Sequence, residues 1–184
     1  YIAGAGIIVS IIGTFMVSVK EGGNPQKGLN IGEFGSSAIM VAVMYFLITT
    51  TIADADVALN IFYATLIGLA SGLGIGMITE YYTGTKFRPV ISVAKSSITG
   101  HGTNVIQGLA VSLEATALPA LIIVSGILLT NSIAGLFGIA IAVTTMLALA
   151  GMVVALDAYG PVTDNAGGIA QMANLPKNVR RTTD

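Results

Sequence analysis

The sequence has no cysteine, no tryptophan and a single histidine among its 184 residues. Without cysteine there is neither a disulfide framework nor a thiolate metal site, and one histidine cannot build a multi-histidine zinc centre. Charged residues make up only 9% of the chain, against roughly 25% in an ordinary soluble domain. The formal net charge of -1 leaves no basic face for nucleic acid. A soluble globular enzyme is therefore excluded, and we expect no nucleic-acid partner.

Long apolar runs dominate what is there, since 54% of the residues are hydrophobic. Five stretches with few or no charges are each long enough to cross a hydrocarbon core of about 30 Å as a helix. We therefore predict an all-α polytopic membrane protein with a single transmembrane region, residues 1–184. Its five transmembrane helices are predicted at about 1–19, 34–53, 57–79, 99–130 and 133–158. The last helix is expected to continue to about residue 174, and short turns are expected at Asp54–Asp56 and near Asn131–Ser132.

The cations of the chain lie on alternate connections between these spans. They are Lys20 and Lys27, then Lys86, Arg88 and Lys95, and finally Lys177, Arg180 and Arg181. By the positive-inside rule these connections, the C-terminal end and Asp164 are predicted to be cytoplasmic. We expect a multi-pass integral protein of a bacterial inner membrane. Because the chain begins without Met inside an apolar run, an internal fragment of a larger transporter is expected.

Two acids near the end of the last span are candidates for chemistry. Asp157 and Asp164 are seven residues apart, so on a continuous helix they share one face at a separation of about 10.5 Å. Gln171 continues the row, whereas Pro161 could kink the helix and weaken the common face. In a purely structural interpretation, Asp157 marks the membrane edge and Asp164 caps a helix that begins near Asn165. Both interpretations remain open at this point.

Hard-cation chemistry suits these residue types better than nucleophilic catalysis. Asp and Asn oxygens are typical ligands of Mg²⁺, which is often bound through one or two carboxylates together with substrate phosphates. The chain has neither a phosphate-binding G-x-x-x-x-G-K-[ST] loop nor an H-E-x-x-H zinc motif. Any phosphate would therefore be held mainly through metal ions and by basic residues supplied elsewhere.

Two further ionisable groups lie in the fourth span. Glu114 is far inside it, and is either a proton or sodium ligand in a pathway or a protonated acid hydrogen-bonded to a neighbouring helix. His101 lies near the cytoplasmic entry, where packing or capping is favoured over a proton-relay role. In the third span, Gly68, Gly72 and Gly76 recur every four residues, which predicts close helix packing. Tyr81 and Tyr82 are interpreted as an aromatic belt at the membrane interface.

With these segments laid out, the chain resembles the membrane-integral pyrophosphatases, the pyrophosphate-energized ion pumps. The resemblance covers essentially the whole chain. It is carried by Glu80-Tyr81-Tyr82-Thr83, by Thr99-Gly100 through Gly108-Leu109-Ala110, by the Glu114–Pro119 stretch, and above all by Asp157–Gly168 with the following Arg180-Arg181-Thr182-Thr183-Asp184. One departure is Gln171, which stands where the family usually has Glu.

The resemblance implies that these spans are the middle of a bundle of about sixteen helices in two rings, assembled as a homodimer. It implies hydrolysis of inorganic pyrophosphate at a cytoplasmic Mg²⁺ site, coupled to H⁺ translocation. By motif position Asp164 is expected to bind Mg²⁺–pyrophosphate, while Asp157, Asn165 and Glu114 are candidates for a supporting network or an ion pathway. The main catalytic residues are expected outside the fragment, which alone should be inactive. A sodium-pumping relative and a non-hydrolytic secondary transporter are the alternatives.

Overall fold

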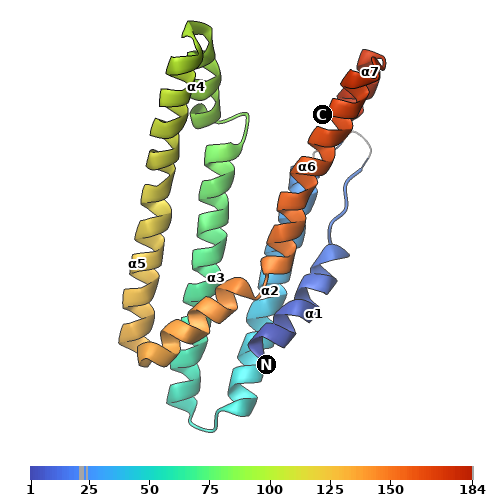
Figure 1. Ribbon diagram of the computed structural model, residues 1–184. Helices are drawn as coiled ribbons and strands as arrows, with labels where there is room; N and C mark the ends of the chain where they lie inside the picture. Colours follow the sequence, from blue (N-terminus) through green and yellow to red (C-terminus); the bar gives the residue numbers. More distant parts are fainter. Residues whose placement is uncertain (21–22, 24, 184) are drawn as a thin grey trace. The chain divides into compact units, whose positions relative to one another are not determined.

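The computed structural model describes residues 1–20, 23 and 25–183, and all regular structure in this part of the chain is helical (Figure 1). The predicted all-α class is therefore confirmed. Three helical stretches are long and apolar enough to cross a membrane, namely Gln26–Thr51, Ala55–Thr99 and His101–Met172. The helices are α1 (Ile2–Thr14), α2 (Pro25–Thr51), α3 (Ala55–Thr83), α4 (Arg88–Ser96), the 3₁₀ turn η1 (Ser97–Thr99), α5 (His101–Leu147), α6 (Ala150–Met172) and α7 (Lys177–Thr183).

The chain divides into two compact units. One contains Tyr1–Ala42 and Ala148–Asp184, and the other contains Val43–Leu147. The first unit holds α1, the beginning of α2, α6 and α7. The second holds the end of α2, α3, α4, η1 and α5. Asp157 and Asp164 therefore belong to the first unit and Glu114 to the second.

In the second unit the first part of α5 runs beside α3 (Figure 1), and glycine on α3 permits the close approach of the last part of α5. A Cβ built at Gly68 would come within 2.9 Å of Cα of Ala142 and closer still to its carbonyl oxygen. A Cβ at Gly72 would meet Cγ of Met146 at 3.3 Å. The close helix packing predicted from the glycine spacing is thus confirmed at these two positions.

The turn that begins α3 is closed by its own aspartate. The Asp54 carboxylate accepts hydrogen bonds from the backbone N–H groups of Asp56 and Val57, at 3.0 and 3.1 Å. This satisfies two of the free donors that every helix N-terminus leaves. The predicted turn at Asp54–Asp56 is confirmed.

The turn expected near Asn131–Ser132 lies slightly further along the chain. Asn131 and Ser132 are helical, and the backbone leaves the helix at Ala134 (φ -138°) and Gly135 (φ 60°, ψ -155°) inside α5. The positive φ of Gly135 lies in a region that residues with a Cβ avoid, so glycine places the bend here.

A second break interrupts the helix that was expected to run from 133 to about 174. Helix α5 ends at Leu147 and α6 begins at Ala150, with Leu149 at φ -100° and ψ 12°. No Gly or Pro occupies 147–150, and the residues there are good helix formers. Local propensity therefore does not mark this break.

The first apolar segment is also shorter as a helix than its apolar run. α1 ends at Thr14, whose hydroxyl donates to the carbonyl oxygen of Ile11 at 2.7 Å. Its 13 residues span about 20 Å, less than the roughly 30 Å of a hydrocarbon core. Within its unit α1 packs against α6, where Ser10 lies beside Gly151, and Gly6 lies against Ala148 just before α6.

Candidate functional site

The two candidate acids lie on one uninterrupted helix. α6 continues from Ala150 to Met172 with Pro161 inside it, so the helix does not end between Asp157 and Asp164. Seven residues are close to two turns, which places both carboxylates on the same face about 10.5 Å apart along the axis. The condition for the common face, a helix that persists through Pro161, is therefore met.

The alternative in which Asp164 caps a helix beginning near Asn165 is wrong. Asp164 lies well inside α6, which begins at Ala150. A capping residue stands at the start of a helix, where its side chain accepts from free backbone N–H groups. The N–H groups that follow Asp164 are already within the helix, so its carboxylate is available for other partners.

Because Pro161 has no N–H, the backbone carbonyl of Asp157 becomes a second hydrogen-bond acceptor beside the Asp157 carboxylate. In a regular helix the N–H of residue 161 donates to the carbonyl oxygen of residue 157. Proline has no N–H, so the Asp157 carbonyl loses this intrahelical partner. Asp157 therefore presents a carboxylate and a backbone carbonyl that can bind a water molecule, a cation or a donor from another segment.

The row of polar side chains lies on the exposed side of α6. Asp157, Asp164, Asn165 and Gln171 are all exposed. The buried residues of α6 are Met152, Gly167 and Ala170, with Met152 and Ala170 exposed by only 1% and 2%. On a helical wheel these three project about 60–140° away from Asp157 and Asp164. The fold thus packs one side of α6 and leaves the acids accessible.

The end of α6 is fixed by a Schellman turn. Asn174 adopts φ 51°, and its N–H donates to the carbonyl oxygen of Gln171 at 3.1 Å. The N–H of Leu175 donates to the carbonyl oxygen of Ala170 at 2.9 Å. This pair of bonds with a left-handed residue defines the motif, and Pro176 follows where the helix cannot continue.

Beyond this turn, α7 is tied back to α6. The guanidinium of Arg180 donates to the side-chain oxygen of Gln171, so the last member of the polar row is bonded to a cation. Lys177 also lies on α7 and is exposed. Gln171, which stands where the family usually has Glu, is thus a neutral acceptor for Arg180. Asp184, at the end of the quoted motif, lies outside the described residues.

The row cannot hold one metal ion by itself. A separation of about 10.5 Å is far beyond what a single ion bridges, because carboxylate oxygens bind Mg²⁺ at about 2.0–2.1 Å. In the described part of the chain no group of three or more His, Asp or Glu side chains is placed to hold a metal. Asp164 and Asn165 do offer the hard oxygen donors that Mg²⁺ prefers. The residues fit one ligand position in a site completed by other groups.

Glu114 and His101 lie in the other unit. Glu114, on α5, accepts a hydrogen bond from the phenol of Tyr82 on α3, with 3.1 Å between Oη and Oε1. The bond to a neighbouring helix agrees with one of the two environments predicted for Glu114, and its protonation there stays a prediction. His101 is the exposed first residue of α5. The sequence interpretation placed Tyr82 in an aromatic belt and missed this role, since a partner 32 residues away leaves no local signal.

These features define a class: a polytopic α-helical membrane protein whose sixth helix presents a row of acids on an accessible face. The family model described as inorganic H⁺ pyrophosphatase matches residues 1–184. The chain belongs to this family of membrane-bound, ion-translocating pyrophosphatases.

Individual relatives agree with the family match. The chain is 54% identical to "Pyrophosphate-energized proton pump 2" of Rhizobium leguminosarum bv. trifolii, over 98% of this chain and 88% of that protein. It is 44% identical to "K(+)-insensitive pyrophosphate-energized proton pump" of Methanosarcina mazei, over 98% of this chain and 27% of that protein. A Clostridium tetani relative, provisionally named a K(+)-stimulated pyrophosphate-energized sodium pump, is 40% identical over 97% of this chain and 27% of its own length. The chain thus spans about a quarter of these two longer relatives.

Proposed function

We propose that the protein containing this chain hydrolyses inorganic pyrophosphate at a Mg²⁺-dependent cytoplasmic site and couples this reaction to H⁺ translocation. The observation that carries the proposal is Asp164, which stands accessible inside the uninterrupted α6 of a member of this family. Relatives at 54% and 44% identity bear the name of pyrophosphate-energized proton pumps. A non-hydrolytic secondary transporter is disfavoured by the same match.

In this proposal Asp164 supplies one carboxylate ligand to the Mg²⁺–pyrophosphate complex. Bound Mg²⁺ neutralises charge on the phosphate oxygens and makes phosphorus easier to attack. Asp164 fixes the position of the complex relative to α6, and Asn165 beside it offers an amide to the same region. Other carboxylates, lysines and the group that activates the attacking water come from parts of the longer protein.

Asp157 is assigned to the network beneath the substrate. It lies about two helical turns from Asp164, too far to share its ion. Its carboxylate and its freed backbone carbonyl provide acceptors through which water or a proton can be held. A change of charge at Asp164 acts on Asp157 through space along the same face, which links events at the substrate to groups lower on the helix.

The orientation proposed for the chain follows from its cations. All eight Lys and Arg fall on three connections that alternate along the predicted spans. The positive-inside rule assigns these connections to the cytoplasm, which puts Arg180 and the accessible end of α6 on the pyrophosphate side. We also propose a bacterial inner-membrane location and a homodimer, the latter from the family resemblance.

The experiment uses inverted membrane vesicles that carry the full-length parent protein. Addition of Mg²⁺ and pyrophosphate should release phosphate and acidify the vesicle lumen, and a protonophore should abolish only the acidification. If a folded, correctly inserted protein releases no phosphate and produces no acidification, the proposal is overturned.

Sodium transport is the second candidate, because the Clostridium tetani relative carries that provisional name. The same vesicles should be assayed with and without Na⁺. Acidification that needs no Na⁺ supports the proton pump. Accumulation of ²²Na⁺ that persists with the protonophore would assign the chain to the sodium-pumping group.

A further inference from the structure

The hydrogen bond between Tyr82 and Glu114 joins two apolar helices at a group that can carry charge. Tyr82 is half-buried near the end of α3, and Glu114 is exposed on α5. Glu114 is the only ionisable side chain between Gly102 and Leu147. Acids in such spans are costly, and they usually mark a proton or ion pathway.

The phenol is held in place independently of Glu114. The ring of Tyr82 meets the ring of Tyr81 edge-on, with 5.2 Å between centroids. Tyr81 in turn contacts the ring of Phe87 at 5.3 Å. Aromatic contacts of this kind restrict the ring positions. The phenol is therefore oriented by contacts that do not involve Glu114.

Other charged groups near this end of the helix pair come from neighbouring segments. On α3 this is Glu80, between α3 and α4 there is Lys86, and α4 contributes Arg88 and Lys95, while the phenol of Tyr81 is a further titratable group. The cations lie on the side predicted to be cytoplasmic. A proton that reaches Glu114 from the cytoplasmic side passes a region with three cations and one carboxylate, that of Glu80.

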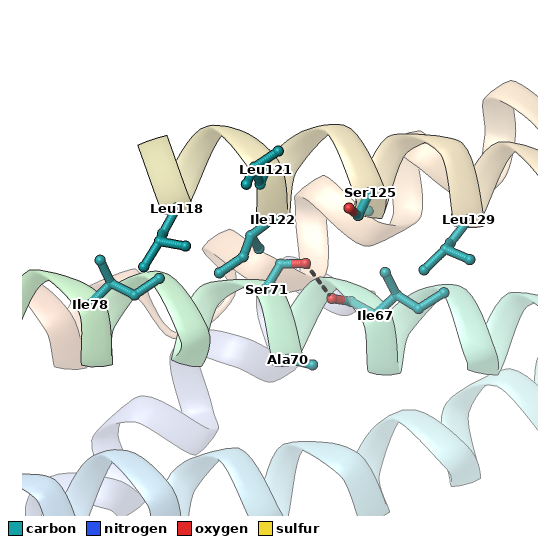
Figure 2. A pocket seen from close by; sticks show the side chains of 10 residues that line it. Ile67, Ala70, Ser71, Ile78, Leu118, Leu121, Ile122, Ser125 and Leu129 are labelled. Atoms are coloured by element: carbon teal, nitrogen blue, oxygen red, sulfur yellow. Dashed lines mark hydrogen bonds between the residues drawn. The ribbon is translucent and has the colours of Figure 1, made fainter. Parts of the chain in front are cut away.

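The Tyr82–Glu114 pair stands at a boundary between polar and apolar contacts. Toward the start of α5, the amide of Asn104 donates to the carbonyl oxygen of Val93 at 2.9 Å, and Gln107 donates to the hydroxyl of Ser92 at 3.2 Å. One turn beyond the pair, Ile78 and Leu118 begin a pocket of about 410 Å³ between α3 and α5. Figure 2 shows that the side chains facing this pocket are almost all aliphatic.

We propose that Glu114 is a second proton-binding site, separate from the α6 acids, and that Tyr82 positions its carboxyl group. A proton from the aqueous side adds to Oε2 and gives the neutral acid, while Oε1 continues to accept from the Tyr82 hydroxyl. The neutral acid is the form that an apolar neighbourhood such as the Ile78–Leu118 pocket tolerates. The binding step stands on this geometry, and its use in transport rests on the proposed pump function.

Two variants separate proton binding from a purely structural hydrogen bond. Glu114→Gln keeps an oxygen that accepts from Tyr82 but cannot bind a proton at neutral pH. Tyr82→Phe keeps the acid and the aromatic contacts but removes the donor. If the pair is only an interhelical tie, Glu114→Gln behaves as wild type and Tyr82→Phe loses stability. If Glu114 binds protons during transport, Glu114→Gln loses proton transport while its thermal stability stays that of the wild type.

The direct measurement is infrared difference spectroscopy of the full-length parent in lipid, between acid and alkaline pH. Among the carboxylic acid C=O bands that appear at acid pH, one component should be lost in Glu114→Gln and should change frequency in Tyr82→Phe. A pH-dependent spectrum unchanged in Glu114→Gln would overturn the proposal.

A transport assay tests whether proton binding at Glu114 is used in pumping, which the infrared band does not report. In vesicles, Glu114→Gln should lower the initial rate of acidification by roughly a hundredfold, the scale lost with a positioned proton-transfer group. Its thermal transition should match that of wild type. Wild-type acidification in Glu114→Gln would contradict a role in transport, whereas absence of pyrophosphate hydrolysis in the wild-type parent would instead contradict the proposed function.

Discussion

Asp157 and Asp164 lie on the same face of one continuous helix, with Pro161 between them. The helix persists although the proline removes the donor for the Asp157 carbonyl. The two acids therefore have unequal surroundings: Asp157 combines a carboxylate with a freed carbonyl, and Asp164 stands beside the amide of Asn165. This inequality underlies their different proposed roles.

The distance between the two acids predicts different consequences of neutralising them. Asp157→Asn keeps the shape of the side chain and leaves the proposed metal ligand untouched, because the separation of about 10.5 Å excludes a shared ion. We expect Asp157→Asn to retain at least about tenfold more pyrophosphate hydrolysis than Asp164→Asn. The measurement is phosphate release by the full-length parent at saturating Mg²⁺. Equal loss in both variants would show that they act as one site.

The contact of Gly68 with the backbone of Ala142 predicts that Gly68→Ala is destabilising. The new methyl group would meet the Ala142 carbonyl, which cannot rotate away as a side-chain tip can. The expected cost is about 1–3 kcal/mol, seen as a lower thermal transition of the detergent-solubilised parent. Gly74→Ala on the same helix is the control, because its Cβ would meet only Cδ1 of Ile122, at 3.3 Å. A transition of Gly68→Ala at or above that of Gly74→Ala would contradict this packing.

The bend in α5 depends on the backbone of Gly135. With φ 60° and ψ -155°, an alanine at this position would be strained by about 1–3 kcal/mol even though the space around it is open. Gly108→Ala is the matched control, since it lies in the same helix with nothing within 4 Å of a new Cβ and without a positive φ. In thermal unfolding, only Gly135→Ala should show a transition temperature below that of the wild type. Equal transitions would mean that the bend does not need glycine.

The Schellman turn predicts opposite effects of two substitutions at Asn174. Alanine at φ 51° costs about 1–2 kcal/mol, whereas glycine adopts this conformation freely. Asn174→Ala should speed amide hydrogen exchange at the end of α6 and in α7, because the turn joins the two helices that the Arg180–Gln171 hydrogen bond connects. Asn174→Gly should exchange as slowly as wild type. Faster exchange in the glycine variant than in the alanine variant would refute the assignment.

Much of the fold could be predicted because membrane spans leave a strong compositional signal. Asp54 could be identified as a turn residue before an apolar run, and the spacing of Gly68 and Gly72 indicated the tight face of α3. The break at Ala148–Leu149 could not be found, since the residues around it favour a helix and tertiary packing decides its place. The other bend was expected a few residues too early, at the polar pair Asn131–Ser132, whereas it lies at Gly135, whose positive φ only the structure shows.

The candidate site was predictable only in part. Residue spacing placed Asp157 and Asp164 in a row, but the sequence could not decide whether the helix survives Pro161, and so could not exclude a capping role for Asp164. The Tyr82–Glu114 hydrogen bond depends on how α3 and α5 pack, which no local pattern encodes. Long-range side-chain pairs of this kind require the structure.

The most direct test of the account is pyrophosphate hydrolysis by membranes carrying the full-length parent with Asp164→Asn. Asp56→Asn is the matched control, since Asp56 is an exposed aspartate in the first turn of α3, far along the chain from α6. With equal expression, we predict that Asp164→Asn loses roughly a hundredfold or more of the Mg²⁺-dependent activity, while Asp56→Asn keeps it. Activity of Asp164→Asn equal to that of the control would contradict the assignment of Asp164 as a ligand of Mg²⁺–pyrophosphate.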